Sequence, residues 1–247
     1  MDVHAVYRVF QNRFRPRRMR KMTTRSGMTS STTVLDVGGT ELNWEYSQVR
    51  PVLTILNVTP NSEQKIGWQV VGDGCRLPFG DDAFDFVFSN SVIEHVSDHE
   101  AFAREIARVG KKYYVQTPNK WFVIEPHLMA PFIHWLPLSW RYKLVKRFTL
   151  WGMIAKPSDA EVEDALATTH LIGTRELLRL FPGASLEREH FLGMTKSIAV
   201  WGGESSSALP SSAPNSARTL RNVALSALIA WTFTKLAQNV RRNRWKP

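Results

Sequence analysis

The chain has 247 residues, of which 43% are hydrophobic and 22% are charged, a composition typical of a folded globular protein rather than a disordered one. Its single cysteine, Cys75, excludes an internal disulfide framework and a zinc site built from several cysteines. The net charge of +10 comes from the chain ends, because residues 1–33 and 204–247 hold eight and seven Lys or Arg against one acid each. The middle of the chain is therefore weakly acidic, and its charge does not indicate a nucleic-acid-binding core.

Residues 1–32 form a basic N-terminal extension. Its apolar residues recur at helical spacing between arginines, which predicts either a basic amphipathic helix lying on a membrane or an extension without a fixed structure. They form no continuous apolar run of the kind that a secretory signal contains. The residues that carry this pattern are Val3, Val6, Tyr7, Phe10 and Phe14.

The other end of the chain is also basic. Residues 204–218 are rich in Ser and Pro and are predicted to be a linker. Residues 219–247 have helical composition and end in a basic run, so we expect a helix that either anchors at a membrane interface or docks on a protein surface. Neither this segment nor any other holds an uninterrupted apolar run long enough to cross a bilayer.

Between the two ends, strand-like and helical patterns alternate. The strand-like runs are short, rich in Val, Ile, Tyr and Phe, and end in residues that favour turns. Residues 98–109 carry apolar side chains three and four positions apart and are predicted to be a helix between the fourth and fifth runs. Strands joined by a crossover helix predict a parallel sheet with a ligand crevice at its carboxyl edge. The five predicted strands are residues 33–37, 53–58, 68–71, 84–90 and 111–117.

The pattern changes after the fifth strand. Residues 174–180 are predicted to be a capped helix, and residues 185–191 and 196–201, separated by a glycine turn, are predicted to be a hairpin. The fold class is therefore α/β, with a mostly parallel sheet that ends in an antiparallel hairpin.

Polar residues and glycines follow successive predicted strands. The first strand ends in Asp36 and is followed by Gly38 and Gly39, whose lack of side chains lets backbone N–H groups approach a ligand. Because parallel strands present their carboxyl ends at one edge, the polar residues after the later strands converge with this loop. These residues are Asn57, Asp73, Gly74 and Asn90.

At this point the sequence resembles the class I S-adenosylmethionine-dependent methyltransferases of the small-molecule type, in particular the methyltransferase type 11 group. The resemblance covers roughly residues 33–201, and its most specific part is the block at 72–96. The stretches that carry it are VLDVGGT at 34–40, LNVTP at 56–60, GDGCRLPFGDDAFDFVFSNSVIEHV at 72–96 and YYVQTPN at 113–119.

The resemblance implies a Rossmann-like sheet of seven strands with helices on both faces, within a methyltransferase domain at 33–203. It also implies S-adenosyl-L-methionine as the cofactor. Asp36 and the glycine pair would hold its methionine end, Asn57 would lie at the ribose, and Asp73 with Gly74 and Cys75 would lie at the adenine. Asn57 is neutral where the family usually has an acid, and the glycine pattern is shorter than usual; either change could weaken cofactor binding.

Methyl transfer requires mainly alignment of two reactants and exclusion of water, so no dedicated catalytic residue is obligatory. If the acceptor is a hydroxyl, a base helps, and His95 after the fourth strand is the first candidate, with Glu94 beside it. The alternative is that His95 only packs at the start of the next helix. His127 is the second candidate for an acceptor contact. No metal is expected, because His95 and His99 could share a helix face but lack a third ligand at a standard spacing.

Residues 119–157 interrupt the alternation and hold many aromatic residues and three prolines. In the family such an insertion commonly covers the substrate. The aromatic density favours an apolar or ring-bearing acceptor or a lipid surface, although the same residues could merely cover the sheet edge.

Two functions from different classes fit these observations. The first is a methyltransferase that acts on a small molecule, with an oxygen of a lipid-, quinone-, polyketide- or glycan-type precursor as acceptor. It would be cytoplasmic, with peripheral contact to the inner face of a membrane through the basic ends. The alternative is a non-catalytic module that docks on a membrane or RNA through those ends. A nicotinamide-dependent oxidoreductase is disfavoured, because the G-x-G-x-x-G fingerprint is absent after the first strand.

Overall fold

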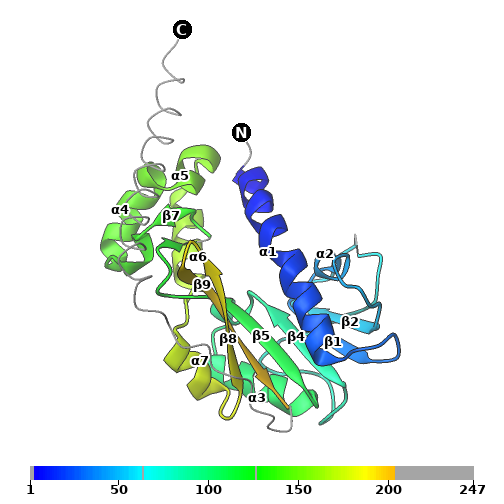
Figure 1. Ribbon diagram of the computed structural model, residues 1–247. Helices are drawn as coiled ribbons and strands as arrows, with labels where there is room; N and C mark the ends of the chain where they lie inside the picture. The colour runs from blue at the N-terminus through cyan, green and yellow to red at the C-terminus, as the bar shows by residue number, and fades with distance from the viewer. Residues whose placement is uncertain (1–2, 63, 126, 204–247) are drawn as a thin grey trace.

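The computed structural model describes residues 3–62, 64–125 and 127–203, and the predicted linker at 204–218 and helix at 219–247 lie outside this part. The strands of the main sheet are β1 (Thr33–Val37), β2 (Val52–Asn57), β3 (Trp68–Val71), β4 (Phe86–Asn90), β5 (Tyr113–Pro118), β8 (Ser185–Phe191) and β9 (Met194–Gly202). Their order is β3-β2-β1-β4-β5-β9-β8 (Figure 1). The first five are parallel, and β9 runs antiparallel to both β5 and β8. The predicted Rossmann-like fold with its antiparallel strand pair is therefore confirmed.

The helices on the main sheet are α1 (Val3–Ser26), α2 (Glu41–Trp44), the 3-10 turn η1 (Ile93–His95), α3 (His99–Val109) and α7 (Thr174–Leu180). The predicted helix at 98–109 is α3, whose N-cap Asp98 accepts a hydrogen bond from the backbone N–H of Ala101 at 2.8 Å. Phe102 and Ile106 then fall on one buried face at helical spacing. Because α2 has only four residues, the helix after the glycine loop is short.

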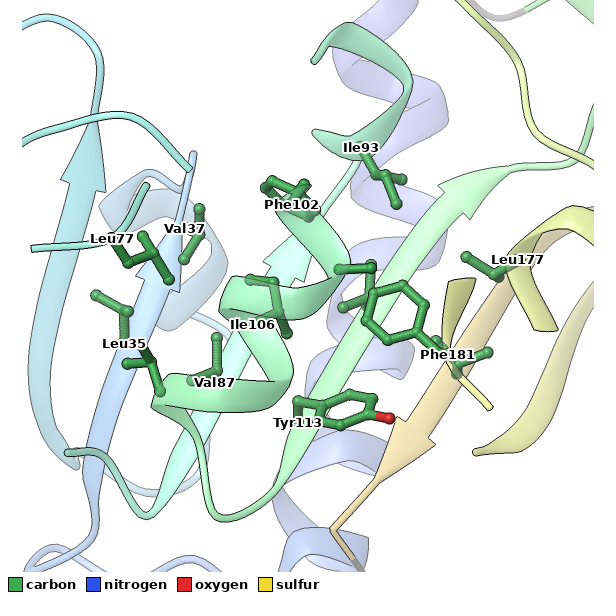
Figure 2. Packing of buried hydrophobic residues seen from close by; sticks show 14 of the residues in the cluster. Leu35, Val37, Leu77, Val87, Ile93, Phe102, Ile106, Tyr113, Leu177 and Phe181 are labelled. Atoms are coloured by element: carbon green, nitrogen blue, oxygen red, sulfur yellow. The ribbon is translucent and has the colours of Figure 1, made fainter. Parts of the chain in front are cut away.

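Helices cover both faces of the sheet. Successive residues of a strand point to opposite faces, so each face presents apolar side chains that helices bury. Leu35, Val37 and Val87 point to the face that α3 and α7 cover, and they belong to one hydrophobic cluster with residues of both helices (Figure 2). Val34 and Phe88 point to the other side, where α1 and α2 lie.

Helix α1 lies against this second face of the sheet. Its residues Met19 and Met22 are each 1% exposed and pack in the same cluster as Val34 of β1. Burial of two such side chains stabilises the fold by about 1.5–3 kcal/mol each. The second half of the segment expected to be an extension therefore contributes to the core, while the domain limits at 32 and 33 remain a prediction.

The insertion after β5 forms a separate small layer. It contains the two-stranded sheet of β6 (Ile124–Glu125) and β7 (Ala130–Pro131), followed by η2 (Ile133–Trp135), α4 (Leu138–Phe148) and α5 (Leu150–Ala155). Next comes α6 (Asp159–Thr168), which begins in a capping box formed by Ser158 and Glu161. A third hydrophobic cluster, to which Leu128, Val145 and Val162 contribute, holds these elements together. We call residues 119–157 the cover.

Within the described ranges, no helix combines the length and the apolar composition that crossing a bilayer requires.

Candidate active site

The loop after β1 comes very close to the side chain of Asp36. Gly38 has φ +71°, a left-handed conformation that favours glycine, and its N–H donates to the carbonyl of Leu56 at 2.8 Å. A Cβ atom on Gly39 would lie 1.9 Å from the Asp36 carboxylate. Only glycine fits there, and this steric restriction explains the second residue of the glycine pair that follows the first strand.

Asp36 is a fully buried acid at the end of β1. Its Oδ2 accepts a hydrogen bond from Nε1 of Trp44 at 2.8 Å, while its Oδ1 is buried with no hydrogen-bond partner among the described residues. Burial raises the pKa of Asp36 to about 7, and the Trp44 bond offsets this only partly. A buried acceptor atom without a partner beneath a glycine loop is suited to a ligand that brings a positive charge or a donor.

The residues after β2 and β3 join the glycine loop. The side-chain Nδ2 of Asn57 donates to the carbonyl of Gly39 at 3.0 Å, and the carbonyl of Asn57 accepts from Gly72 N–H at 3.0 Å. Beyond Gly72, a carboxylate oxygen of Asp73 accepts the backbone N–H of Cys75 at 2.8 Å. Gly74 is also tightly placed, because a Cβ atom there would lie 2.8 Å from the ring of Phe102. Asp36, Gly38, Gly39, Asn57, Asp73, Gly74 and Cys75 thus lie along one continuous edge of the sheet.

Asn90, at the end of β4, is bound to the N-terminal helix. Its Oδ1 accepts a hydrogen bond from the guanidinium of Arg18, which also donates to Gln116 at 2.9 Å. The same guanidinium forms two hydrogen bonds with the carboxylate of Glu189, at 2.6 and 2.5 Å. Arg18 was missed by sequence reasoning, because it is one of many arginines in a basic run and its spacing carries no signal.

The two predicted catalytic histidines lie together although 32 residues separate them. The rings of His95 and His127 are 4.8 Å apart, centroid to centroid, and nearly perpendicular. His127 Nδ1 lies 2.6 Å from Oε1 of Glu125, which is 3% exposed. Burial alone would lower the pKa of His127, but the hydrogen bond and charge of Glu125 raise it overall. Glu125 was not predicted, although its position two residues from His127 in a strand-like stretch is the signal that could have found it.

A second buried acid adjoins the histidine pair. Glu94 is fully buried in η1, and its Oε2 accepts a hydrogen bond from Oγ1 of Thr117 at 2.9 Å. Its Oε1 is buried without a hydrogen-bond partner in the described part of the chain. Burial raises the pKa of Glu94 to about 7.

A cavity of about 430 Å³ opens between the cover, α7 and the start of α3. Glu125 and His127 line it, together with the basic side chains of Lys120 and Arg141. The predicted cofactor residues are not among its lining residues, so this cavity is a candidate for the acceptor side rather than for the cofactor.

The histidine pairing differs from the one considered in the sequence. The sequence spacing pairs His95 with His99 on one helix face, without a third metal ligand. In the structure His99 Nδ1 lies 3.7 Å from Glu176, whereas His95 lies beside His127 and Glu94. The ligand atoms of these last three residues all lie within 4.8 Å of one another.

Residues 39–113 match the family model described as "Methyltransferase domain". A curated relative, norajmaline N-methyltransferase from Rauvolfia serpentina, is 47% identical over 47 residues, which are 19% of this chain and 16% of that protein. The chain thus matches about a sixth of the length of this relative.

Solved structures with a similar arrangement include two methyltransferases. Haemonchus contortus phosphoethanolamine N-methyltransferase 2, solved in complex with S-adenosyl-L-methionine, is 16% identical with a TM-score of 0.43, covering 65% of this chain and 35% of that one. A SAM-dependent methyltransferase from Aquifex aeolicus is 16% identical with a TM-score of 0.40, covering 73% of this chain and 86% of that one.

Proposed function

We propose that this chain, whose residues 39–113 belong to the methyltransferase domain family, transfers a methyl group from S-adenosyl-L-methionine to a small-molecule acceptor. The observation that carries the proposal is the contact between Gly39 and the buried Asp36 carboxylate, directly after β1 in a sheet of this topology. Such a loop at the carboxyl edge of a parallel sheet is where this class of fold binds its ligands.

The residues at this edge fit the cofactor. The free Oδ1 of buried Asp36 would accept a hydrogen bond from the ammonium group at the methionine end. Asn57 would face the ribose with its remaining hydrogen-bonding capacity, and Asp73, Gly74 and Cys75 would border the adenine. When bound, the cofactor supplies a methyl group already attached to a good leaving group.

The chain has two tasks in this reaction, to align the acceptor and to exclude water. We assign the acceptor side to His127, which lines the cavity under the cover, and to His95, whose ring packs against that of His127. Glu125 holds the Nδ1 side of His127, so the Nε2 nitrogen is left for the acceptor. A hydroxyl acceptor would lose its proton to this group as its oxygen bonds to the methyl carbon.

The acceptor proposed is an oxygen of a lipid-, quinone-, polyketide- or glycan-type precursor. Several aromatic side chains of the cover are exposed. They are not among the residues that line the cavity, so they would contact apolar or ring-bearing parts of an acceptor that extends beyond it. The exposed side chains include Trp121 at 68% exposure, Trp140 at 61% and Phe148 at 62%. The relative in Rauvolfia serpentina is named as an N-methyltransferase, so a nitrogen acceptor is the competing outcome for the assay.

The same exposed aromatic residues, with the basic chain ends, also support peripheral contact with the inner face of a membrane in a cytoplasmic protein. A non-catalytic module that docks on a membrane or RNA through these ends is the alternative function. It predicts no affinity for the cofactor.

Calorimetric titration of S-adenosyl-L-methionine into the full chain tests the proposal. We expect saturable binding to the wild type and its loss in Gly39→Ala, because the added Cβ would collide with Asp36. Gly80→Ala is the matched control, since a Cβ atom there meets nothing within 4 Å, and it should bind like the wild type. Absence of binding to the wild type would favour the non-catalytic module.

A further inference from the structure

We propose that Glu94, His95 and His127 form a binding site for one divalent transition-metal cation at the acceptor side. This inference deepens the proposed function, because it concerns the residues assigned to the acceptor. Two histidines and one carboxylate are a ligand set that zinc, iron, manganese and cobalt ions take in proteins.

The first argument is the convergence of the ligand atoms. One carboxylate oxygen of Glu94 and one ring nitrogen each of His95 and His127 all lie within 4.8 Å of one another. Ligands about 2.1 Å from a tetrahedral ion are about 3.4 Å apart, so the cluster must close by roughly 1.4 Å at its widest point. Rotation of the exposed His95 ring and of the half-buried His127 ring would supply this closure.

The second argument is that two of the three ligands are already oriented by another group. Glu125 binds Nδ1 of His127 at 2.6 Å, and Thr117 donates to Oε2 of Glu94 at 2.9 Å. Partners of this kind fix ring orientation and tautomer in metal sites, and a carboxylate on the far nitrogen of a histidine is one of the usual arrangements.

The third argument is the unpaired oxygen of Glu94. Oε1 is buried and has no hydrogen-bond partner among the described residues. A buried acceptor without a partner destabilises the folded state, and a bound cation would satisfy it. The oxygen that Thr117 does not occupy is therefore the one available to the ion.

The ligand count indicates what the ion would do. Three protein ligands leave at least one coordination position open, as in catalytic rather than structural sites. If the proposed methyl transfer holds, an oxygen of the acceptor would fill that position, and the cation would orient it and favour loss of its proton to water. This favours an oxygen acceptor over a nitrogen acceptor. With the ion bound, Nε2 of His127 would be a ligand and would no longer act as the base.

Titration of Co²⁺ into the untagged, full-length chain after dialysis against EDTA tests the inference, with the visible absorption of bound Co²⁺ as the readout. No cofactor or acceptor is added. We expect saturable binding of one equivalent and at least a tenfold loss of affinity in Glu94→Gln and in His127→Ala. Glu125→Gln, which alters a positioning residue, should weaken binding by about 10- to 100-fold.

His99→Ala is the matched control, since this neighbouring histidine pairs with Glu176 and contributes no ligand atom to the cluster. It should bind Co²⁺ like the wild type. Glu94→Gln keeps the oxygen that Thr117 contacts and removes a buried charge, so the variant should fold, and its thermal unfolding checks this.

Absence of one-equivalent binding to the wild type would overturn the inference. Equal affinities of Glu94→Gln and the wild type, or an equal loss in His99→Ala, would also overturn it. Calorimetry with S-adenosyl-L-methionine on the same samples separates the two proposals. Cofactor binding without Co²⁺ binding overturns the metal site alone, and the reverse result overturns the proposed function alone.

Discussion

Replacement of Asp36 by Asn should make the protein more stable, although Asp36 lies in the proposed cofactor site. The pKa of this buried carboxyl is raised from 3.8 to about 7 by burial. Between these two values the folded state holds more protons than the unfolded state. The free energy of unfolding of the wild type therefore falls as the pH rises through this window. Above about pH 7 the whole loss of stability caused by the buried charge of Asp36 is present.

The size of the effect follows from the same two values. The gap between 3.8 and about 7, at 1.36 kcal/mol for each pH unit, corresponds to about 4 kcal/mol. Asn removes the charge and keeps an oxygen for the hydrogen bond from Trp44. The free energy of unfolding of the variant should thus exceed that of the wild type by little at pH 4 and by up to about 4 kcal/mol at pH 8.

Urea denaturation followed by tryptophan fluorescence at several pH values measures this difference. Asp164→Asn, a change of an exposed acid on α6, is the control and should stay within about 0.5 kcal/mol of the wild type at every pH. A difference between Asp36→Asn and the wild type that does not grow with pH would refute the reasoning. The same variant should bind S-adenosyl-L-methionine more weakly, because the acceptor for the ammonium group has lost its charge.

Three further predictions concern helix α1 and its contacts. Arg18→Met leaves the largely buried Glu189 without its main partner and should lower the free energy of unfolding by about 3–5 kcal/mol, measured by denaturation. Burial would raise the pKa of Glu189, but the charge and hydrogen bonds of Arg18 outweigh it and lower this pKa to about 2. The wild type should therefore lose stability as the pH falls from 4.5 toward 2, and Glu189→Gln should remove part of that loss. Met19→Ala should cost about 2–5 kcal/mol, whereas Thr24→Ala on the exposed side of α1 should change stability by less than about 0.5 kcal/mol; equal effects would show that α1 does not pack on the sheet.

Local periodicity was sufficient to predict most of the sheet and its helices. The limits of β1, β3 and β8 match the predicted ranges, and α3 begins one residue after its predicted start because Asp98 is its cap. These elements are determined by side chains that are close in sequence. The packing of α1 was not predictable in the same way, because Met19 and Met22 lie within a basic run that also fits a membrane-surface helix.

The candidate site was predictable where one loop forms it, or where residues follow neighbouring parallel strands, as Asn57 and Asp73 do. Asp36 and Gly39 could be identified as a pair because they belong to one loop. The meeting of His95 with His127 depends instead on the path of the chain through β5 and β6, which no local pattern encodes. The same holds for Asn90 and Arg18, whose contact spans 72 residues.

Hydrogen–deuterium exchange with and without S-adenosylhomocysteine tests the central claim most directly, because it locates the bound ligand on the chain. The account predicts slower exchange of backbone amides at 36–40, 57–58 and 72–75, the loops that meet at the carboxyl edge of the sheet. Unchanged exchange throughout the chain, or protection confined to residues 120–141 of the cover, would contradict it.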